Sequence, residues 1–292
     1  HTFKIPYFTA YNNLCIQRRL YVIASPKGVA ISLSGSCSKM IYIMLPAYNE
    51  EGSITSCITR IAGVMGKAVL PYRIVIVNDG STDRTLDIIS KLRGHIPLEI
   101  VSHTVNKGVG QVFRTGFNYV CRECRPEDIV VAMESDNTND PAILPVMIEK
   151  IDKEGFDVVC ASRYVSGGSY EGFPFMRLVL SKAANNILRL YFRIPQIRDY
   201  TIFFRAYKAG ILKNALNYYK DKFIESRGFV CNAEILIKLR PFAARCTEVP
   251  FIYRYDMKAG ASKLKISITV WEYFRFMILN GTVPFSERKC RK

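Results

Sequence analysis

Residues 129–141 read IVVAMESDNTNDP, and this stretch decides the fold of the chain. Its first five residues are an apolar run with two valines, which is typical of a strand buried on both faces of a parallel sheet. Glu134 and Asp136 follow directly, and side chains two positions apart on an extended segment point the same way. The two carboxylates therefore indicate either a divalent-cation site that binds a diphosphate, or a solvated turn whose acids cap the next helix.

The same succession of strand and polar cluster repeats along the chain from Met40 onward. Helical patterns, with apolar residues three and four positions apart, separate the apolar runs. The predicted strands are residues 41–45, 74–77, 98–102, 129–133 and 157–162. Polar clusters follow four of them, at residues 46–51, 78–83, 106–110 and 134–140. Repeated βα units predict a parallel sheet covered by helices, in which ligands bind beyond the carboxyl ends of the strands.

The composition excludes several classes of protein. An apolar fraction of 49% is sufficient for a packed core and argues against a disordered chain. Nine cysteines without a repeating spacing favour buried thiols in a reducing compartment over a disulfide framework. Cys121 and Cys124 form a lone CxxC within a helical pattern, which favours packing over zinc or redox chemistry. The three histidines have no ligand spacing, so no histidine-based metal site is predicted.

The net charge of +16 is concentrated in the last part of the sequence. Residues 40–172 carry 13 basic and 17 acidic side chains, whereas residues 173–292 carry 23 and 8. The basic half is therefore expected to meet an anionic partner. Nucleic acid, a phosphorylated substrate and an anionic membrane surface are the three candidates.

Residues 1–39 contain no acid and no clear periodicity, and we expect them to form a flexible or non-native leader. Their apolar runs are too short and too broken for a signal peptide. Nowhere does an apolar run reach about 18 residues, so no membrane-spanning helix is expected. The expected division is this leader, an α/β domain at 40–264 with an amphipathic insertion at 173–194, and an amphipathic membrane-associated segment at 265–292.

Two helical stretches in the basic half, residues 173–194 and 265–279, interleave apolar and aromatic residues with cations. Such a pattern fits helices that lie in a membrane interface, and it also fits core helices with a solvated outer face. The positive charge of this half favours the membrane surface, with the chain attached peripherally at the cytoplasmic leaflet.

Seven motifs occur in an order that resembles nucleotide-sugar transferases of the GT-A fold. The motifs are LPAYNEE (45–51), VNDGSTD (77–83), NKGVG (106–110), MESDNTNDP (133–141), SRYVSGG (162–168), RDYTIFFRAYK (198–208) and GASKL (260–264). Over residues 40–265 the sequence is most similar to the dolichol-phosphate mannose synthase group and its bacterial polyprenyl-phosphate relatives. The resemblance implies an α/β fold with a Rossmann-like, mostly parallel sheet flanked by helices, followed by C-terminal amphipathic interfacial helices.

The resemblance also implies roles for particular residues. Those expected to bind the nucleotide-sugar are Pro46, Tyr48, Glu50, Asp79, Lys107, Glu134, Ser135, Asp136, Lys258 and Lys263. Glu134 and Asp136 match the DxD motif and would hold Mg²⁺ or Mn²⁺, although the family's first aspartate is a glutamate in this chain. Lys263 matches a basic residue on a late loop that contacts phosphate. The family tends to carry arginine at the position of Met257, where Lys258 can substitute as a point charge.

Arg163 and Asp199 are, with Asp136 and Lys263, the expected catalytic residues. Arg163 precedes a Gly/Ser-rich loop, and an arginine at the base of a mobile loop suits closure over a phosphate; a surface hairpin is the alternative. Asp199 precedes an aromatic-rich segment, residues 200–207, that is expected to form a strand. Its carboxylate could pair with Arg198 or Arg205, whereas the resemblance places it near the acceptor.

The sequence as a whole predicts a metal-dependent, inverting glycosyltransferase that moves a sugar, mannose or glucose, from a nucleoside diphosphate to a polyprenyl (dolichyl or undecaprenyl) phosphate. An ionised acceptor phosphate needs cations to position it and no strong base, which fits a site rich in Arg and Lys and free of histidine. Two alternatives remain: transfer to a sugar hydroxyl, with Asp199 as base, and a basic nucleic-acid-binding protein. The prediction of membrane association is also compatible with an integral membrane protein as a partner.

Overall fold

The computed structural model describes residues 21–25, 28–32, 39–258 and 266–280. The chain divides into two compact units, residues 1–39 and 40–292. In the first unit, strands β1 (Tyr21–Ser25) and β2 (Gly28–Ser32) pair as an antiparallel two-stranded sheet. That residues 1–39 form a flexible or non-native leader stays a prediction.

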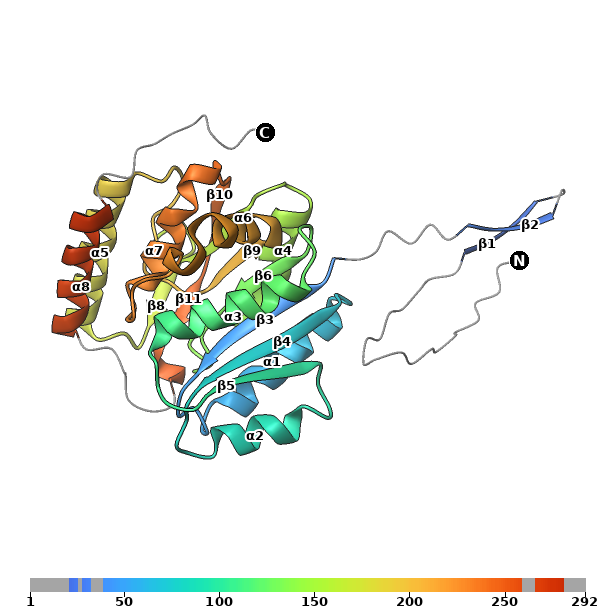
Figure 1. The fold of residues 1–292 in the computed structure, drawn as a ribbon, viewed down its shortest axis with the longest axis horizontal. Coiled ribbons are helices and arrows are strands. Elements are labelled where there is room, and N and C mark those ends of the chain that lie inside the picture. Colours follow the sequence, from blue (N-terminus) through green and yellow to red (C-terminus); the bar gives the residue numbers. More distant parts are fainter. Residues whose placement is uncertain (1–20, 26–27, 33–38, 259–265, 281–292) are drawn as a thin grey trace. The chain divides into compact units, whose positions relative to one another are not determined.

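The second unit is built on a seven-stranded sheet with the order β10-β7-β9-β6-β3-β4-β5 (Figure 1). Its strands are β3 (Ile41–Ala47), β4 (Tyr72–Asp79), β5 (Leu98–His103), β6 (Ile129–Ala132), β7 (Val158–Ser162), β9 (Arg205–Lys208) and β10 (Cys246–Pro250). Neighbouring strands are parallel except at β9, which runs antiparallel to both β6 and β7. The five strands expected from apolar runs are therefore confirmed, and so is the mostly parallel sheet.

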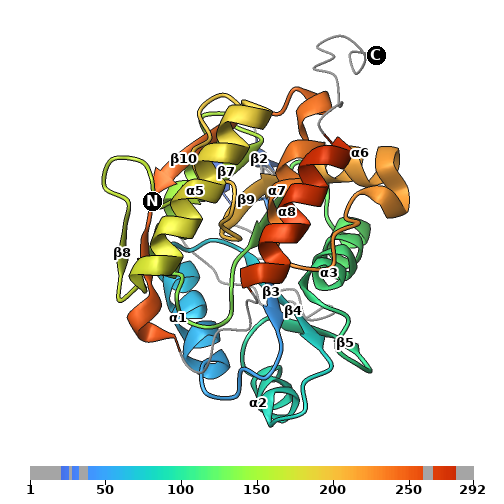
Figure 2. The ribbon, with the colours of Figure 1, turned by 90° about the vertical axis from the view of Figure 1, so that its left-hand side faces the viewer.

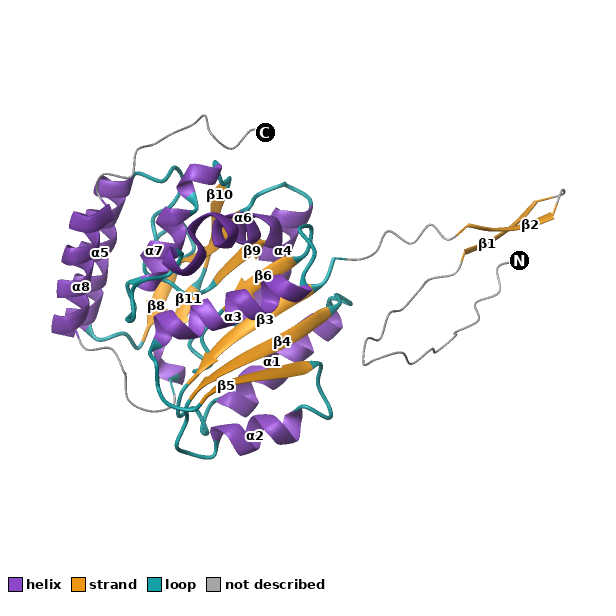
Figure 3. Ribbon diagram, in the orientation of Figure 1, coloured by secondary structure: helices purple, strands orange, loops and turns teal. Residues whose placement is uncertain are grey.

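Helices cover both faces of this sheet (Figure 3). On β3, Ile41 and Ile43 pack into one layer of the core, while Tyr42 and Met44 pack into the other, so the strand is apolar at every position. The first layer is closed by α1 (Ile54–Lys67), α2 (Thr85–Leu92) and α4 (Leu144–Asp152). The second is closed by α3 (Val109–Glu123), α6 (Ala209–Tyr219) and α7 (Cys231–Lys238).

Shorter elements connect these layers. Single 3-10 turns occur at Pro141–Ile143, Lys220–Lys222, Arg240–Phe242 and Tyr255–Met257. A small parallel sheet pairs β8 (Ser169–Glu171) with β11 (Ile252–Arg254). Cys121 and Cys124, the lone CxxC, are free thiols at the end of α3, and Cys124 is buried in the core.

The prediction of a strand over residues 200–207 is wrong for its first half, because β9 begins only at Arg205. The side chains of Tyr200 and Phe204 are fully buried, but the N–H groups of residues 200 and 201 bond to side chains. Backbone pairing with β7 begins only at the carbonyl oxygen of Phe204, which accepts a bond from the N–H of Ala161 at 3.0 Å. Tyr200 N donates to Asn185 Oδ1 at 2.7 Å and Thr201 N donates to Asp199 Oδ1 at 3.3 Å. Apolar composition alone does not distinguish such a buried irregular segment from a strand.

Helices α5 (Phe175–Phe192) and α8 (Ile266–Asn280) lie side by side along one side of the unit (Figure 2). Tyr191 Oη donates to the carbonyl oxygen of Met277 at 3.1 Å, and the rings of Phe192 and Phe276 are 5.7 Å apart. The two helices therefore form one layer, although they are far apart in the sequence.

This layer has a buried inner face and an apolar outer face. Leu188 and Phe192 belong to the core, and the placement of 173–194 at a membrane interface stays a prediction. The outer face nevertheless exposes large apolar side chains, among them Phe175 (73% exposed), Leu190 (72%) and Trp271 (65%). Among the helices that the structure describes, none is long and apolar enough to cross a membrane.

Candidate active site

A cavity of about 930 Å³ lies beyond the carboxyl ends of β3, β4 and β6 and reaches the inner face of α5 and α8. Its sheet-side lining is mostly polar and its helix-side lining mostly apolar. The lining residues predicted from the sequence are Pro46, Tyr48, Glu50, Asp79, Glu134, Ser135, Asp136, Arg163 and Lys258. The predicted site is thus brought together, apart from Lys107 and Asp199, which do not line the cavity, and Lys263, which falls outside the described residues.

The acidic pair lies where β6 ends. Asp136 is almost fully buried, and its Oδ1 accepts bonds from the backbone N–H of Thr138 at 3.2 Å and from the Thr138 hydroxyl at 2.6 Å. Its other oxygen, Oδ2, accepts a bond from the ammonium group of Lys258. The turn after β11 thus brings a basic residue onto the acidic pair, although the two lie far apart in the sequence.

The electrostatics of the pair follow from burial and proximity. Burial, reinforced by the negative charge of Asp136, raises the pKa of Glu134 to about 8, and the charges of Lys258 and Arg163 oppose this shift. The pKa of Lys258 is raised: burial alone would lower it, but the charge and hydrogen bond of Asp136, together with the charges of Glu134 and Glu50, outweigh burial. A second positive charge at this point would therefore stabilise the ionised form of Glu134.

These residues fit a divalent cation that is shared with a substrate. Carboxylate oxygens are the ligands that Mg²⁺ and Mn²⁺ prefer, and the crowding of negative charge at Glu134 and Asp136 is what such an ion relieves. Within the described parts of the chain, however, no group of three or more His, Cys, Asp or Glu side chains could hold a metal ion. Two carboxylates leave most of the coordination shell to other oxygens, as expected for an ion that also binds a diphosphate.

The ends of β3 and β6 are tied together beside the acidic pair. The hydroxyl of Ser135 donates to the carbonyl oxygen of Pro46 at 2.7 Å. Glu50 is nearly buried, and its Oε2 accepts a bond from the Ser53 hydroxyl, also at 2.7 Å. These bonds fix the wall of the cavity that carries Tyr48 and Glu50.

Asp79 at the end of β4 shapes the loop that follows β5. Its Oδ1 and Oδ2 accept bonds from the backbone N–H groups of Lys107 and Gly108, each at 2.9 Å. His103 Nδ1 lies 2.7 Å from Asp79 Oδ1, with both side chains buried. His103 stands behind Asp79 and does not line the cavity. The side chain of Lys107 is exposed, so this loop approaches the cavity with its backbone.

The two glycines of the NKGVG motif permit a close backbone contact. Gly108 has a φ of +89°, a conformation that residues with a side chain rarely adopt. The N–H of Gly110 donates to the carbonyl oxygen of Arg227 at 3.0 Å, and a Cβ at Gly110 would lie only 1.8 Å from the carbonyl oxygen of Ser226. The segment that carries Arg227 into the cavity lining is thereby held against the start of α3.

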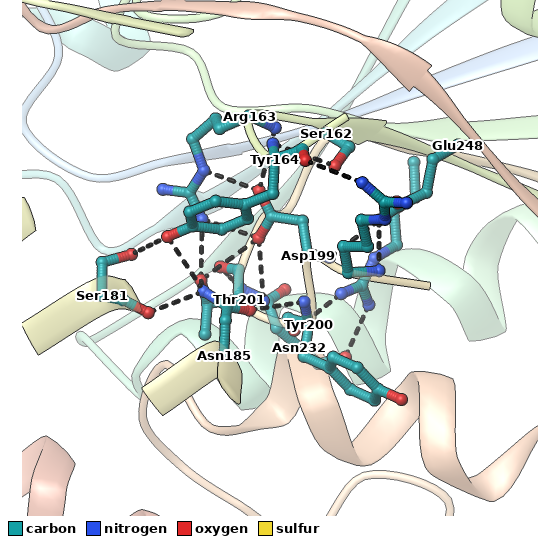
Figure 4. A network of polar contacts seen from close by, with 12 residues as sticks. Ser162, Arg163, Tyr164, Ser181, Asn185, Asp199, Tyr200, Thr201, Asn232 and Glu248 are labelled. Carbon is teal, nitrogen blue, oxygen red and sulfur yellow. Dashed lines mark hydrogen bonds and ion pairs between the residues drawn. The ribbon is translucent and has the colours of Figure 1, made fainter. Parts of the chain in front are cut away.

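Arg163 and Asp199 form a buried two-armed ion pair (Figure 4). Arg163 Nε donates to Asp199 Oδ2 and Arg163 Nη2 donates to Asp199 Oδ1, both at 2.7 Å. The Nη2 group also donates to the hydroxyl of Thr201 at 2.7 Å. The sequence analysis considered Arg198 and Arg205 as ion-pair partners of Asp199, and neither pairing occurs. Because both of its oxygens are bound by a guanidinium, Asp199 is poorly placed to accept a proton from a substrate.

Aromatic rings hold the other side of this guanidinium. Its central carbon lies 5.2 to 5.6 Å from the ring centres of Tyr164, Tyr170 and Tyr253. Burial opposes the charge of Arg163, but the carboxylate of Asp199 more than compensates, and the pKa of Arg163 is raised. A rigid, permanently charged group therefore stands in the cavity wall.

Several lining residues were missed by the sequence analysis as site residues. Arg177 of α5 lines the cavity, and its Nη1 donates to the Tyr255 hydroxyl at 3.0 Å. Arg227 comes from the segment before α7. In the sequence analysis, both were counted only among the many basic residues of the last half of the chain. No local motif marks them, because the tertiary fold selects which arginines of this half turn inward.

A mostly parallel sheet that ends in a DxD-like acidic pair, beside a deep cavity, defines the GT-A class of glycosyltransferases. Crystal structures of glucosyl-3-phosphoglycerate synthase from Mycobacterium tuberculosis share this fold. One of them, in complex with Mn²⁺, uridine diphosphate and phosphoglyceric acid, matches with a TM-score of 0.60 at 18% identity, over 84% of this chain and 80% of that chain.

The sequence comparisons identify the family. Residues 42–216 match the model of glycosyl transferase family 2, and the chain belongs to this family. A dolichol-phosphate mannosyltransferase of Pyrococcus furiosus is 33% identical over 235 residues, which are 80% of this chain and 62% of that protein. A polyprenol monophosphomannose synthase of Mycolicibacterium smegmatis is 28% identical over 224 residues, which are 76% of this chain and 80% of that protein. The chain thus spans less than two thirds of the first of these relatives.

Proposed function

We propose that this protein transfers a sugar, mannose or glucose, from a nucleoside diphosphate to a polyprenyl phosphate, with inversion at the anomeric carbon. The observation that carries the proposal is the chemistry of one continuous cavity: acids at the sheet, Arg163 and Arg177 in the wall, and apolar side chains of α5 and α8 opposite. The donor diphosphate would bind at the acids through a metal ion, the acceptor phosphate at the two arginines, and the hydrocarbon chain of the acceptor at the apolar side chains. The names of the two sequence relatives support the same substrates.

The donor would bind at the sheet side. Pro46, Tyr48 and Glu50 would contact the nucleotide, while Asp79 holds the backbone of residues 107–108 toward it. Glu134 and Asp136 would hold Mg²⁺ or Mn²⁺, which when bound neutralises the departing diphosphate as a Lewis acid. A related fold crystallised with Mn²⁺ supports the use of a divalent ion.

The acceptor chemistry fits a site without a free base. A phosphate monoester has a second pKa of about 6 and is largely ionised at neutral pH. One of its oxygens forms the bond to the anomeric carbon while the bond from that carbon to the diphosphate oxygen breaks, and no proton has to move. Arg163 and Arg177 would orient the acceptor phosphate. Transfer to a sugar hydroxyl would instead need a base, and Asp199 is held by Arg163.

We also propose that the outer face of α5 and α8 lies on a membrane surface, at the cytoplasmic leaflet. Exposed Phe175, Leu190 and Trp271 on one face, with the basic charge of this half, suit an interfacial helix pair. A polyprenyl acceptor resides in the bilayer, so this placement would bring the helix side of the cavity to its substrate. The nucleic-acid alternative lacks support, because these aromatic residues lie on helices and not on an exposed sheet.

A radiolabelled sugar-transfer assay tests the function. Nucleoside diphosphate mannose or glucose, labelled in the sugar, is incubated with the protein, Mg²⁺ or Mn²⁺, and a polyprenyl phosphate in detergent. Label that enters the organic phase supports the proposal, and label in a water-soluble glycan supports the hydroxyl acceptor. The variant Asp136→Asn is the control, since it should abolish transfer. Absence of label from both products, with the nucleoside diphosphate sugars tried, would contradict the proposed activity.

A further inference from the structure

A second, smaller cavity of about 400 Å³ lies at the C-terminal end of α5, away from the site described above. Three arginines line it, Arg189 and Arg193 from the end of the helix and Arg198 from the segment that follows. The turn between them, residues 194–197, completes the lining. Three guanidinium groups around one small cavity form a binding surface for an anion.

The three arginines have no acidic partner among the residues that the structure describes. Arg193 Nε donates to the carbonyl oxygen of Leu190 at 3.1 Å, and Arg198 Nη1 reaches the carbonyl oxygen of Tyr164 at 3.5 Å. The nearby carboxylate of Glu248 accepts bonds from the backbone N–H groups of Arg198 and Asp199, at 2.8 and 2.7 Å. The C-terminal end of a helix favours a nearby cation, which accounts for an arginine at the end of α5. Arg198 follows the turn, and its charge repels those of the two helical arginines, a repulsion that a bound anion would relieve.

The turn is held in a fixed shape. Arg193 and Gln196 adopt left-handed backbone conformations, with φ of +48° and +65°, which reverse the chain after α5. Ile194 and Ile197 are buried, and the N–H of Ile194 donates to the Tyr200 hydroxyl at 3.0 Å. The positions from which the guanidinium groups extend are therefore set before any ligand binds, which lowers the entropic cost of binding.

The cavity adjoins the apolar outer face of α5. Ile187, Leu190 and Tyr191 lie between and beside the two helical arginines in the sequence, and each is about half exposed or more. A free inorganic anion would make no favourable contact with these apolar side chains, whereas a phospholipid carries its phosphate next to hydrocarbon chains. We propose that Arg189, Arg193 and Arg198 bind the phosphate of an anionic membrane phospholipid at a discrete site, which orients the protein on the bilayer. This inference rests on the membrane association proposed above.

Vesicle co-sedimentation with the full chain tests the proposal. The vesicles are phosphatidylcholine mixed with phosphatidic acid, which exposes a phosphate monoester, or with phosphatidylserine at equal surface charge. Arg189→Gln/Arg193→Gln/Arg198→Gln should weaken binding to phosphatidic acid by about tenfold and remove the preference over phosphatidylserine. The matched control, Lys67→Gln/Lys91→Gln/Lys208→Gln, removes the same charge from exposed positions elsewhere and should weaken binding to both lipids equally and less.

Single variants add a sharper criterion. Arg198 lies beyond the turn, so Arg198→Gln alone should reduce the preference for phosphatidic acid if the cavity is the site. Equal losses in the arginine and lysine variants would show that only net charge matters and would overturn the discrete site. Failure of the unaltered protein to bind any vesicle would overturn the site and the membrane association together. Sugar transfer to an acceptor in detergent reports the proposed activity separately, and all these variants should retain it.

Discussion

The guanidinium of Arg163 and the carboxylate of Asp199 meet through two bonds of 2.7 Å, with both side chains removed from solvent. Asp199 thus serves as an anchor: it holds the planar charge of Arg163 toward the cavity while three tyrosine rings pack around it. The arrangement positions a cation for a phosphate and removes Asp199 from proton transfer.

Asp199→Asn should therefore destabilise the fold and impair transfer together. Loss of one partner of a buried pair leaves Arg163 uncompensated, at a cost of about 3 kcal/mol or more in the free energy of unfolding. Urea denaturation measures this change. Asp256→Asn is the control, because its pair with Arg254 is exposed, and the denaturation midpoint should hardly move. Equal, small shifts in both variants would contradict the anchoring role.

Arg163→Lys separates charge from geometry. Lysine keeps the positive charge but cannot make the two-armed contact, so the variant should fold and still lose transfer by about a hundredfold. The loss should lie mainly in kcat/KM for the acceptor and little in that for the donor. Steady-state kinetics with each substrate varied in turn measure this. An unchanged acceptor dependence would show that Arg163 only stabilises the fold.

Lys258 should compete with the metal ion for Asp136. Transfer should require Mg²⁺ or Mn²⁺ and stop in excess chelator, and Asp136→Asn should abolish Mn²⁺ binding without unfolding the protein. Lys258→Met removes the ammonium group from Asp136 Oδ2, so Mn²⁺ alone should bind several times more tightly, while the nucleoside diphosphate should bind more weakly. Electron paramagnetic resonance of free Mn²⁺ measures the first effect. Full activity in chelator would refute the metal assignment.

Binding to vesicles should have a part that resists salt. Trp271 and Phe274 are exposed on α8, and Trp271→Ser/Phe274→Ser should weaken binding in high salt by tenfold or more, since burial of two aromatic side chains contributes about 1.4 kcal/mol at least. Val146→Ser, on α4, is the control and should bind normally. Co-sedimentation at two salt concentrations measures the binding. Equal binding by the unaltered protein, the double variant and the control would show that α8 does not contact the membrane.

A chain that begins at Met40 should fold and retain activity. The backbone N–H of Met40 donates to Asp128 Oδ1 at 2.9 Å, and its carbonyl accepts from Ile129, so bonds of Met40 hold the chain directly before β3. A chain that begins at Ile43 loses those bonds and the pairing of residues 41 and 42 with β6, and it should be less stable. Thermal unfolding and transfer assays compare the two. Loss of activity in the chain from Met40 would give residues 1–39 a functional role.

The sequence predicted the elements that have a local signature. Central parallel strands such as β3 and β6 are apolar throughout because both faces are buried, and the polar clusters at their ends are the sites of the predicted residues. The antiparallel β9 was misjudged at its start, because burial makes residues 200–204 as apolar as a strand while the N–H groups of residues 200 and 201 bond to side chains.

Pairings between distant segments had no such signature. Asp199 has Arg198 as its neighbour in the sequence, yet it pairs with Arg163. Arg205 is fully buried and donates to the carbonyl oxygens of Asn232 and Tyr200. Three arginines of similar appearance in the sequence thus have three different environments, which only the packing of the chain assigns.

The contact of Gly110 with Ser226 and Arg227 has a consequence for the divergence of the family. With no room for even a methyl group at position 110, the second glycine of NKGVG is required by the neighbouring loop. A descendant that acquired alanine there would have to reroute residues 226–228 in compensation. The two segments should accordingly covary among distant relatives, and a change in one without the other should mark a lineage in which this wall of the cavity has been rebuilt.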